Sequence, residues 1–186
     1  MSEKKTCYIN FFARIEQRSI GALMRAVQDR LRKGVERFII LISSPGGQVA
    51  AGLSAYNFLR GIPAEVETHN YGSVDSVAIV LFCAGIRRKC VPNARFFLHG
   101  VGFDVPQGAR FETKQLEEKM KGLRIDVENL ARVIAENCNR DARDIERDML
   151  EVKELNPTQA RDYGLVHEIQ RELYPKGADV VLIAPK

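Results

Sequence analysis

The sequence predicts an α/β protein in which strands and helices alternate along the chain. Two observations carry this prediction. Apolar runs rich in β-branched residues, such as Arg37 to Ile42, are typical of strands that are buried on both faces of a sheet. The segments between these runs repeat apolar residues at the three- and four-residue spacing of a helix that packs one face on such a sheet.

The first half of the chain contains three predicted strand and helix pairs. Ser19 is placed to cap the first helix and Gly34 to end it, since a serine hydroxyl can accept a bond from a free N–H of the first turn and glycine suits a helix end. We expect strands over residues 7–12, 37–42 and 65–71, and helices over residues 19–31, 49–60 and 77–84.

The second half begins with two short predicted strands, residues 89–91 and 95–99, which the turn residues Pro92 and Asn93 separate. A long charged helix follows over residues 111–137. Its apolar residues alternate steps of four and three along one face, namely Leu116, Met120, Leu123, Val127, Leu130 and Ile134. Such a helix could cover the sheet of its own domain, but its charged length favours an arm that packs on another subunit.

The C-terminal part contains a short predicted helix over residues 141–149 and another that starts with Asn156 as cap and Pro157 in its first position. The Gly164-Leu-Val segment is expected to close into a last strand. Because no linker-like stretch interrupts the chain, residues 1–186 are expected to form a single domain.

Composition narrows the classes of function. The chain has 28 Lys and Arg residues against 24 Asp and Glu residues, spread over its whole length. Such a small positive surplus argues against a nucleic-acid partner. No apolar run approaches the roughly 20 residues needed to cross a bilayer. The segment Met1 to Lys5 lacks the features of a secretory signal, so a cytoplasmic location is expected.

The cysteines and two of the histidines give no metal signal. Four cysteines, Cys7, Cys83, Cys90 and Cys138, lie far apart without a CxxC pair, and we expect them to be buried free thiols. His69 and His167 have no second ligand at metal spacing, so surface or rim positions are expected for them. The sequence therefore predicts no metal and no cofactor.

Three places could carry chemistry, because each follows a predicted strand at the sheet edge where α/β proteins place their ligands: Gly46-Gly47, Ser76 and His99. Ser76 lies between a glycine-containing turn and an apolar helix, a position that suits a nucleophile but that a simple helix cap also explains. His99 closes an apolar run, and taken alone it is more typical of a hydrogen-bonded rim histidine.

Acyl transfer needs a nucleophile, a base of near-neutral pKa and donors aimed at the oxygen that becomes negative. Paired glycines after a strand allow the backbone to approach a ligand closely. The natural donors here are the backbone N–H of Gly47 and that of Val77, which directly follows the serine.

Four sequence blocks, taken in order, resemble the proteolytic subunit of the Clp protease, a serine peptidase. They are Ser44-Pro-Gly-Gly-Gln-Val-Ala-Ala-Gly, Gly72-Ser-Val-Asp-Ser-Val-Ala, Pro92-Asn-Ala-Arg-Phe-Phe-Leu-His and Ala160-Arg-Asp-Tyr-Gly-Leu-Val. The likeness extends over about residues 8–169.

The resemblance implies a ClpP/crotonase-like β-α superhelix with a long handle helix after Phe111 that joins stacked rings of a homo-oligomer. It implies Ser76 as nucleophile, His99 as general base, and the N–H groups of Gly47 and Val77 as the oxyanion hole. The implied substrates are short peptides or unfolded proteins.

The chain departs from the family pattern at several positions. The family has an aspartate eleven residues before the Tyr-Gly-Leu-Val block, where this sequence has Val152, and valine cannot orient an imidazole. Either Glu151 or Glu154 substitutes, or activity is weak, since removing the aspartate of a serine triad can cost roughly ten-thousandfold in kcat. Asp75 and Gly100 also stand where other residues are usual.

An ATP-dependent unfoldase partner receives little support, because the first predicted strand begins only a few residues from Met1, where the family has a docking segment. The leading hypothesis is a Clp-like serine endopeptidase. The alternative is a weak or silent ring subunit that keeps the fold and the assembly helix. A third class, the crotonase-type acyl-thioester enzyme, needs acid and base carboxylates, and the Ser76 and His99 pair argues against it.

Overall fold

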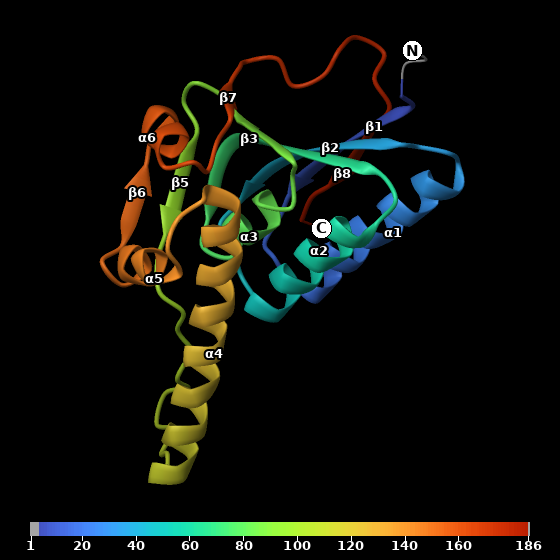
Figure 1. Ribbon diagram of the computed structural model, residues 1–186. Coiled ribbons are helices and arrows are strands. Elements are labelled where there is room, and N and C mark those ends of the chain that lie inside the picture. The colour runs from blue at the N-terminus through green and yellow to red at the C-terminus, as the bar shows by residue number, and fades with distance from the viewer. Residues whose placement is uncertain (1–3, 186) are drawn as a thin grey trace.

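The computed structural model describes residues 4–185 and arranges them around one mixed β-sheet (Figure 1). Within these residues the strand order is β6-β5-β3-β2-β1-β8, and β4 pairs with both β3 and β7. All pairs are parallel except that of β5 with β6. The strands are β1 (Thr6–Phe12), β2 (Arg37–Ser44), β3 (Glu65–Asp75), β4 (Arg87–Cys90), β5 (Arg95–Leu98), β6 (Lys153–Leu155), β7 (Glu168–Ile169) and β8 (Val180–Ile183).

The helices lie on one side of the central strands, except that α4 projects from the body as an arm (Figure 1). They are α1 (Gln17–Arg32), α2 (Val49–Gly61), α3 (Ala78–Phe82), α4 (Thr113–Cys138), α5 (Ala142–Leu150) and α6 (Pro157–Asp162). Alternate residues of β2, Phe38, Ile40 and Ile42, are fully buried in the core together with the whole of α3. The predicted α/β class is therefore confirmed.

Several predicted boundaries were wrong. The first helix begins at Gln17 with Glu16 as N-cap, and Ser19 lies in its first turn, where its hydroxyl accepts a bond from the Glu16 N–H at 3.1 Å. The Gly164-Leu-Val segment is not a strand, and the strand that follows is β7. The structure adds β6 and β8, which the sequence patterns did not predict.

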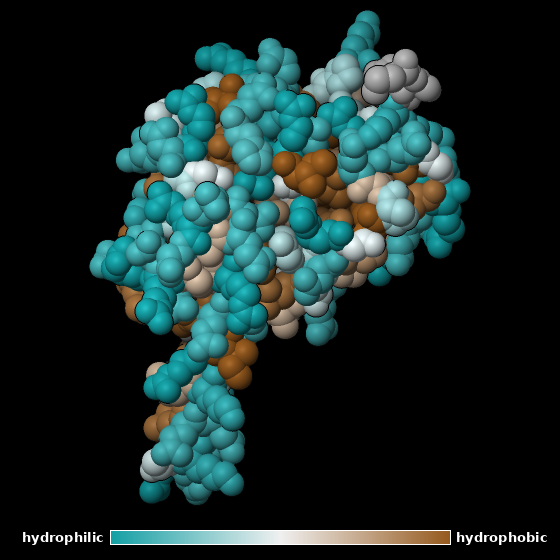
Figure 2. All heavy atoms as spheres, viewed as in Figure 1, coloured by the Kyte–Doolittle hydropathy of each residue, from teal (hydrophilic) through white to brown (hydrophobic). Residues whose placement is uncertain are grey.

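The apolar face of α4 divides into two parts. Leu130 and Ile134 are buried against the body, whereas Leu116 and Met120, about three to five turns earlier, are 43% and 47% exposed. Figure 2 shows apolar side chains on the surface of the projecting arm. The C-terminal third of the helix therefore anchors the fold, and the rest presents apolar side chains to a partner or to solvent.

All four cysteines are buried free thiols, as predicted. Burial raises the pKa of both Cys90 and Cys138 to about 11, so these thiols stay protonated near neutral pH. No helix among residues 4–185 is both long and apolar enough to cross a membrane.

Candidate active site

Ser76 lies in a tight turn between β3 and α3 with an unusual backbone conformation. Its φ angle is +57°, in the left-handed region that costs a non-glycine residue about 1 to 2 kcal/mol. The Ser76 N–H donates to the Phe97 carbonyl at 2.7 Å, which fixes the turn to the neighbouring strand β5. Val77, not Ser76, is the N-cap of α3, and no side chain caps this helix. The simple capping explanation for Ser76 is therefore wrong.

The glycine pair packs directly against this turn. A Cβ atom on Gly46 would lie 2.7 Å from the Asp75 carbonyl oxygen and 2.7 Å from the Ser76 Cβ, so no side chain fits there. Gly46 also has a φ of +83°, which favours glycine. The Gly46 backbone is therefore packed closely against Ser76.

The orientation of the Gly47 N–H is set by Ile15. The Gly46 carbonyl accepts a bond from the Ile15 N–H at 2.9 Å, and the Gln48 N–H donates to the Ile15 carbonyl at 2.8 Å. Since the peptide between Gly46 and Gly47 is trans, its N–H points opposite to its carbonyl, away from Ile15. Neither this N–H nor that of Val77 donates to another group within residues 4–185. Both predicted donors are therefore uncommitted.

His99 follows β5, which is paired in parallel with the end of β3, so it lies near Ser76. Ser76 and His99 line one small pocket of about 10 Å³, room for about one water molecule. The rest of its wall is apolar and comes from α3, β5, α4 and α5: Ile79, Val80, Leu98, Leu130, Ile134 and Met149. No hydrogen bond joins Ser76 to His99 in the part of the chain that the structure describes.

The imidazole of His99 makes two contacts with its own strand segment. Its Nδ1 lies 2.7 Å from the Gly100 carbonyl oxygen. Its ring centroid lies 5.2 Å from that of Phe97, with 38° between the two planes. These contacts leave Nε2 as the nitrogen available to the pocket.

The expected third group can be located from the strand register. In the antiparallel pair of β5 and β6, Phe97 is opposite Glu154 and Leu98 is opposite Lys153. Extending this register by one residue would bring Val152, directly before β6, opposite His99, directly after β5. Val152 is 53% exposed and has a φ of +59°. Glu154 is exposed, and within residues 4–185 no hydrogen bond joins it to His99.

The other carboxylates near the site have different partners. Glu151 is the exposed C-cap of α5. The Asp75 carboxylate accepts a bond from the Ser73 hydroxyl at 2.5 Å and pairs with Arg95 at 3.2 Å. It is therefore committed to its own strand and to β5 rather than to His99.

A buried network that the sequence patterns did not identify supports this region. Asp148 accepts bonds from the Lys153 ammonium and, at 2.6 Å, from the Tyr163 hydroxyl. Burial acts to raise the pKa of Asp148, but the bonds from Lys153 and Tyr163 outweigh it and hold the pKa below its ordinary value. Burial and Asp148 together raise the pKa of Tyr163. The network ties α5 to β6 and α6, and so places Val152.

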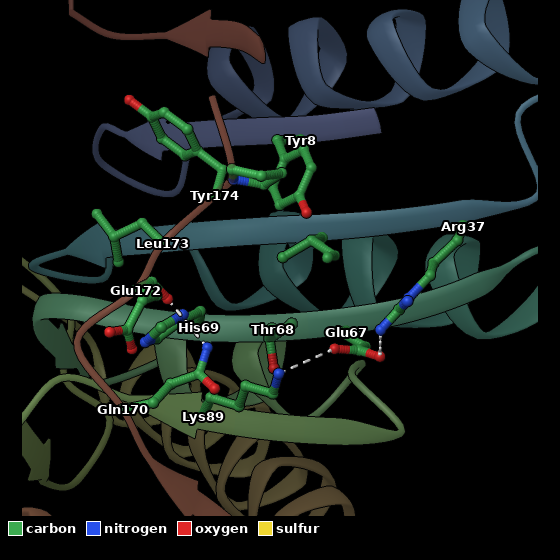
Figure 3. A pocket seen from close by; sticks show the side chains of 12 residues that line it. Tyr8, Arg37, Glu67, Thr68, His69, Lys89, Gln170, Glu172, Leu173 and Tyr174 are labelled. Carbon is green, nitrogen blue, oxygen red and sulfur yellow. Dashed lines mark hydrogen bonds and ion pairs between the residues drawn. The ribbon is translucent and has the colours of Figure 1, made fainter. Parts of the chain in front are cut away.

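A second cavity, of about 360 Å³, lies on the other face of the sheet beneath residues 170–175 (Figure 3). There Glu67 sits between Arg37 and Lys89, whose ammonium is 3.6 Å away. His69 lines this cavity and is only 1% exposed, so the predicted surface position was wrong. Burial lowers the pKa of His69 and outweighs a hydrogen bond with the Gln170 backbone, which acts to raise it.

This second cavity has no serine or cysteine in its lining, so it lacks a nucleophile of the predicted kind. His167 lies elsewhere, directly before β7, where its Nδ1 accepts a bond from the Arg88 N–H at 3.0 Å. Burial and the nearby Arg88 lower the pKa of His167. Neither His69 nor His167 lines the pocket of Ser76. The pocket that Ser76 shares with His99 is therefore the better candidate for acyl transfer.

Comparison with known proteins defines the class. The family model described as Clp protease matches residues 19–172, and the chain therefore belongs to the Clp protease family. This confirms the resemblance inferred from the four sequence blocks.

Among solved structures, the chain is similar to a single-substitution mutant of ClpP1 from Listeria monocytogenes. The two share 24% sequence identity over 90% of this chain and 92% of that chain, with a TM-score of 0.79. At this identity the likeness shows the fold, and it confirms the predicted ClpP-like architecture with its long helix α4.

Proposed function

We propose that this protein is a serine endopeptidase that hydrolyses peptide bonds of short peptides or unfolded proteins. Ser76 is the nucleophile, His99 the general base, and the N–H groups of Gly47 and Val77 form the oxyanion hole. The observation that supports the proposal is the left-handed turn at Ser76: Ser76 lines one pocket with His99, directly precedes the uncommitted Val77 N–H, and packs against Gly46, which precedes the uncommitted Gly47 N–H.

The proposed reaction proceeds through an acyl-enzyme. The Ser76 Oγ attacks the carbonyl carbon of the scissile bond while its proton passes to Nε2 of His99, and the carbonyl oxygen becomes negative between the two N–H donors. The C–N bond then breaks, and His99 returns the proton to the leaving amine. A water molecule, deprotonated by His99, releases the acyl group. No cofactor or metal is needed.

The proposal includes assembly into a ring-type homo-oligomer through the arm of α4. The exposed Leu116, Met120 and Ile125 support it, because a helix that projects from the body leaves these side chains without cover from its own chain. One domain over residues 1–186 and a cytoplasmic location stay predictions. The prediction about a docking segment for an unfoldase concerns the N-terminus and falls partly on residues 1–3, outside the described residues.

A second candidate function is a weak or silent ring subunit. Val152 favours it, because the position opposite His99 carries no carboxylate. The lack of a hydrogen bond from Ser76 to His99 within residues 4–185 favours it too. The two candidates share the fold and differ in whether Ser76 is activated.

The intact-protein mass after incubation with a fluorophosphonate distinguishes them, because this probe reports an activated serine without a guessed substrate. We expect one adduct on the wild type, none on Ser76→Ala and a much slower reaction on His99→Gln. Ser54→Ala, which removes an exposed helical hydroxyl, is the matched control and should label as the wild type does. An unlabelled wild type that is folded and assembled would support the silent subunit instead.

A further inference from the structure

We propose that Phe97 and the Gly100 carbonyl together orient His99, in the role that a carboxylate plays in a serine triad. The inference rests on the proposed function and deepens it, since it names the groups that position the base. Phe97 is a positioning residue in this scheme, because it acts through Ser76 and His99 and not on the substrate.

The first step of the argument is the tautomer of His99. A carbonyl oxygen can only accept, so the 2.7 Å contact between Nδ1 and the Gly100 oxygen requires the proton to be on Nδ1. A neutral imidazole then carries its lone pair on Nε2. This is the tautomer that a general base needs, and it is the one that the aspartate of a triad selects. The Gly100 carbonyl therefore supplies one of the two functions of the absent carboxylate.

The second step is the place of Phe97. Its carbonyl accepts the Ser76 N–H at 2.7 Å, and its ring lies against the His99 ring at 5.2 Å. One residue thus holds the backbone of the nucleophile and one face of the base. The Arg95 guanidinium lies 5.9 Å from the centroid of the same Phe97 ring. It also pairs with Asp75, which directly precedes Ser76.

The third step is that no carboxylate competes for this role among the described residues. Val152, which follows from extending the β5–β6 register to His99, has no carboxylate, and Glu154 opposite Phe97 is exposed. A carbonyl carries only a partial charge, so it stabilises the imidazolium that forms during attack less than an aspartate would. The arrangement therefore keeps the correct tautomer and loses most of the electrostatic assistance.

Long-range ¹H–¹⁵N correlation of the histidine side chains tests the tautomer without any turnover. His99→Gln identifies the His99 signals. At alkaline pH, where the imidazole is neutral, we expect the proton on Nδ1 in the wild type and a mixture of tautomers in Phe97→Ala. A proton on Nε2 in the wild type would overturn the inference. This outcome is independent of whether Ser76 reacts, so it is distinguishable from failure of the proposed function.

A restored carboxylate provides the second test. In Val152→Asp we expect fluorophosphonate labelling at least about tenfold faster than in the wild type. The acidic limb of its pH profile should move up by about one pH unit, because an anion near the imidazole favours the charged form. Val152→Asn, of the same shape without the charge, should leave the limb where it is. Identical profiles for the two variants would mean that position 152 does not face His99, against the register on which the inference depends.

Discussion

Replacing Val152 by asparagine is expected to stabilise the protein. Helix α5 ends at Leu150 with Glu151 as C-cap, and Val152 is the next residue, with a φ of +59°. Helices commonly end in a left-handed residue at this position, and it is usually glycine or asparagine. A β-branched residue is a true outlier there. At the C-terminal end of α4 the chain itself uses an asparagine, Asn139, which is the C-cap there and has a φ of +54°.

The magnitude follows from the backbone cost. A left-handed conformation costs an ordinary L-residue about 1 to 2 kcal/mol, and asparagine largely avoids this cost. Little is lost in return, because the Val152 side chain is 53% exposed and buries only part of its apolar surface. We expect a net gain of about 1 kcal/mol, which for a chain of this size raises Tm by roughly 2 to 4 °C.

Scanning calorimetry and urea unfolding at matched protein concentration would measure this gain. Val105→Asn is the matched control, because Val105 is 57% exposed and has no positive φ. We expect no gain from it. If Val152→Asn melted at or below the wild-type temperature, the assignment of strain to this residue would be refuted.

Three further variants test other parts of the structure. In Gly46→Ala the new methyl group would lie 2.7 Å from backbone and Ser76 atoms, so fluorophosphonate labelling should fall at least about tenfold, as intact mass would report. Arg88→Met removes a buried cation that donates to four backbone carbonyls and should cost about 3 kcal/mol in urea unfolding, whereas Arg87→Met, at an exposed side chain, should cost less than 1 kcal/mol. Equal costs would contradict that account. The ionised Asp148 contributes stability that is present above the ordinary aspartate pKa, about 4, and is lost as pH falls through its lowered native pKa, so the stability difference between wild type and Asp148→Asn should shrink in acid. A difference that stays constant from neutral pH to pH 2 would contradict it.

The parts of the fold that the sequence predicted are those with strong local signals. The run from Phe38 to Ile42 and the helical repeat that ends at Ile134 each bury enough apolar surface to fix their element type. Strand β8 was missed although Val180-Val-Leu-Ile is an apolar run rich in β-branched residues; it pairs with the edge of β1, and Val180 and Leu182 are exposed there. Strand β6 has three residues, too few for a periodicity, and it too is defined by its partner.

The candidate site likewise combines residues that the sequence could identify with contacts that only the structure reveals. Ser76, His99 and the glycine pair could be proposed because their residue types suit acyl transfer after a strand. The contacts that orient His99 could not, because they come from a backbone carbonyl, which every residue has, and from a phenylalanine that a sequence presents as ordinary core. The left-handed conformation at Val152 was equally hidden, since valine is the residue that least suggests it.

The bond from the Ile15 N–H to the Gly46 carbonyl has a consequence for rate. A peptide plane at the end of a strand and between two glycines could rotate and present its oxygen to the pocket in place of its N–H. The Ile15 N–H holds this plane by its carbonyl, so rotation would break that hydrogen bond, and the Ile15 carbonyl holds the next peptide through the Gln48 N–H. In the proposed mechanism the Gly47 N–H is therefore held in one orientation before substrate arrives, and no part of the activation barrier is spent on turning it. The connection between β1 and α1, far from Ser76 in the chain, thereby sets how ready the pocket is to receive negative charge.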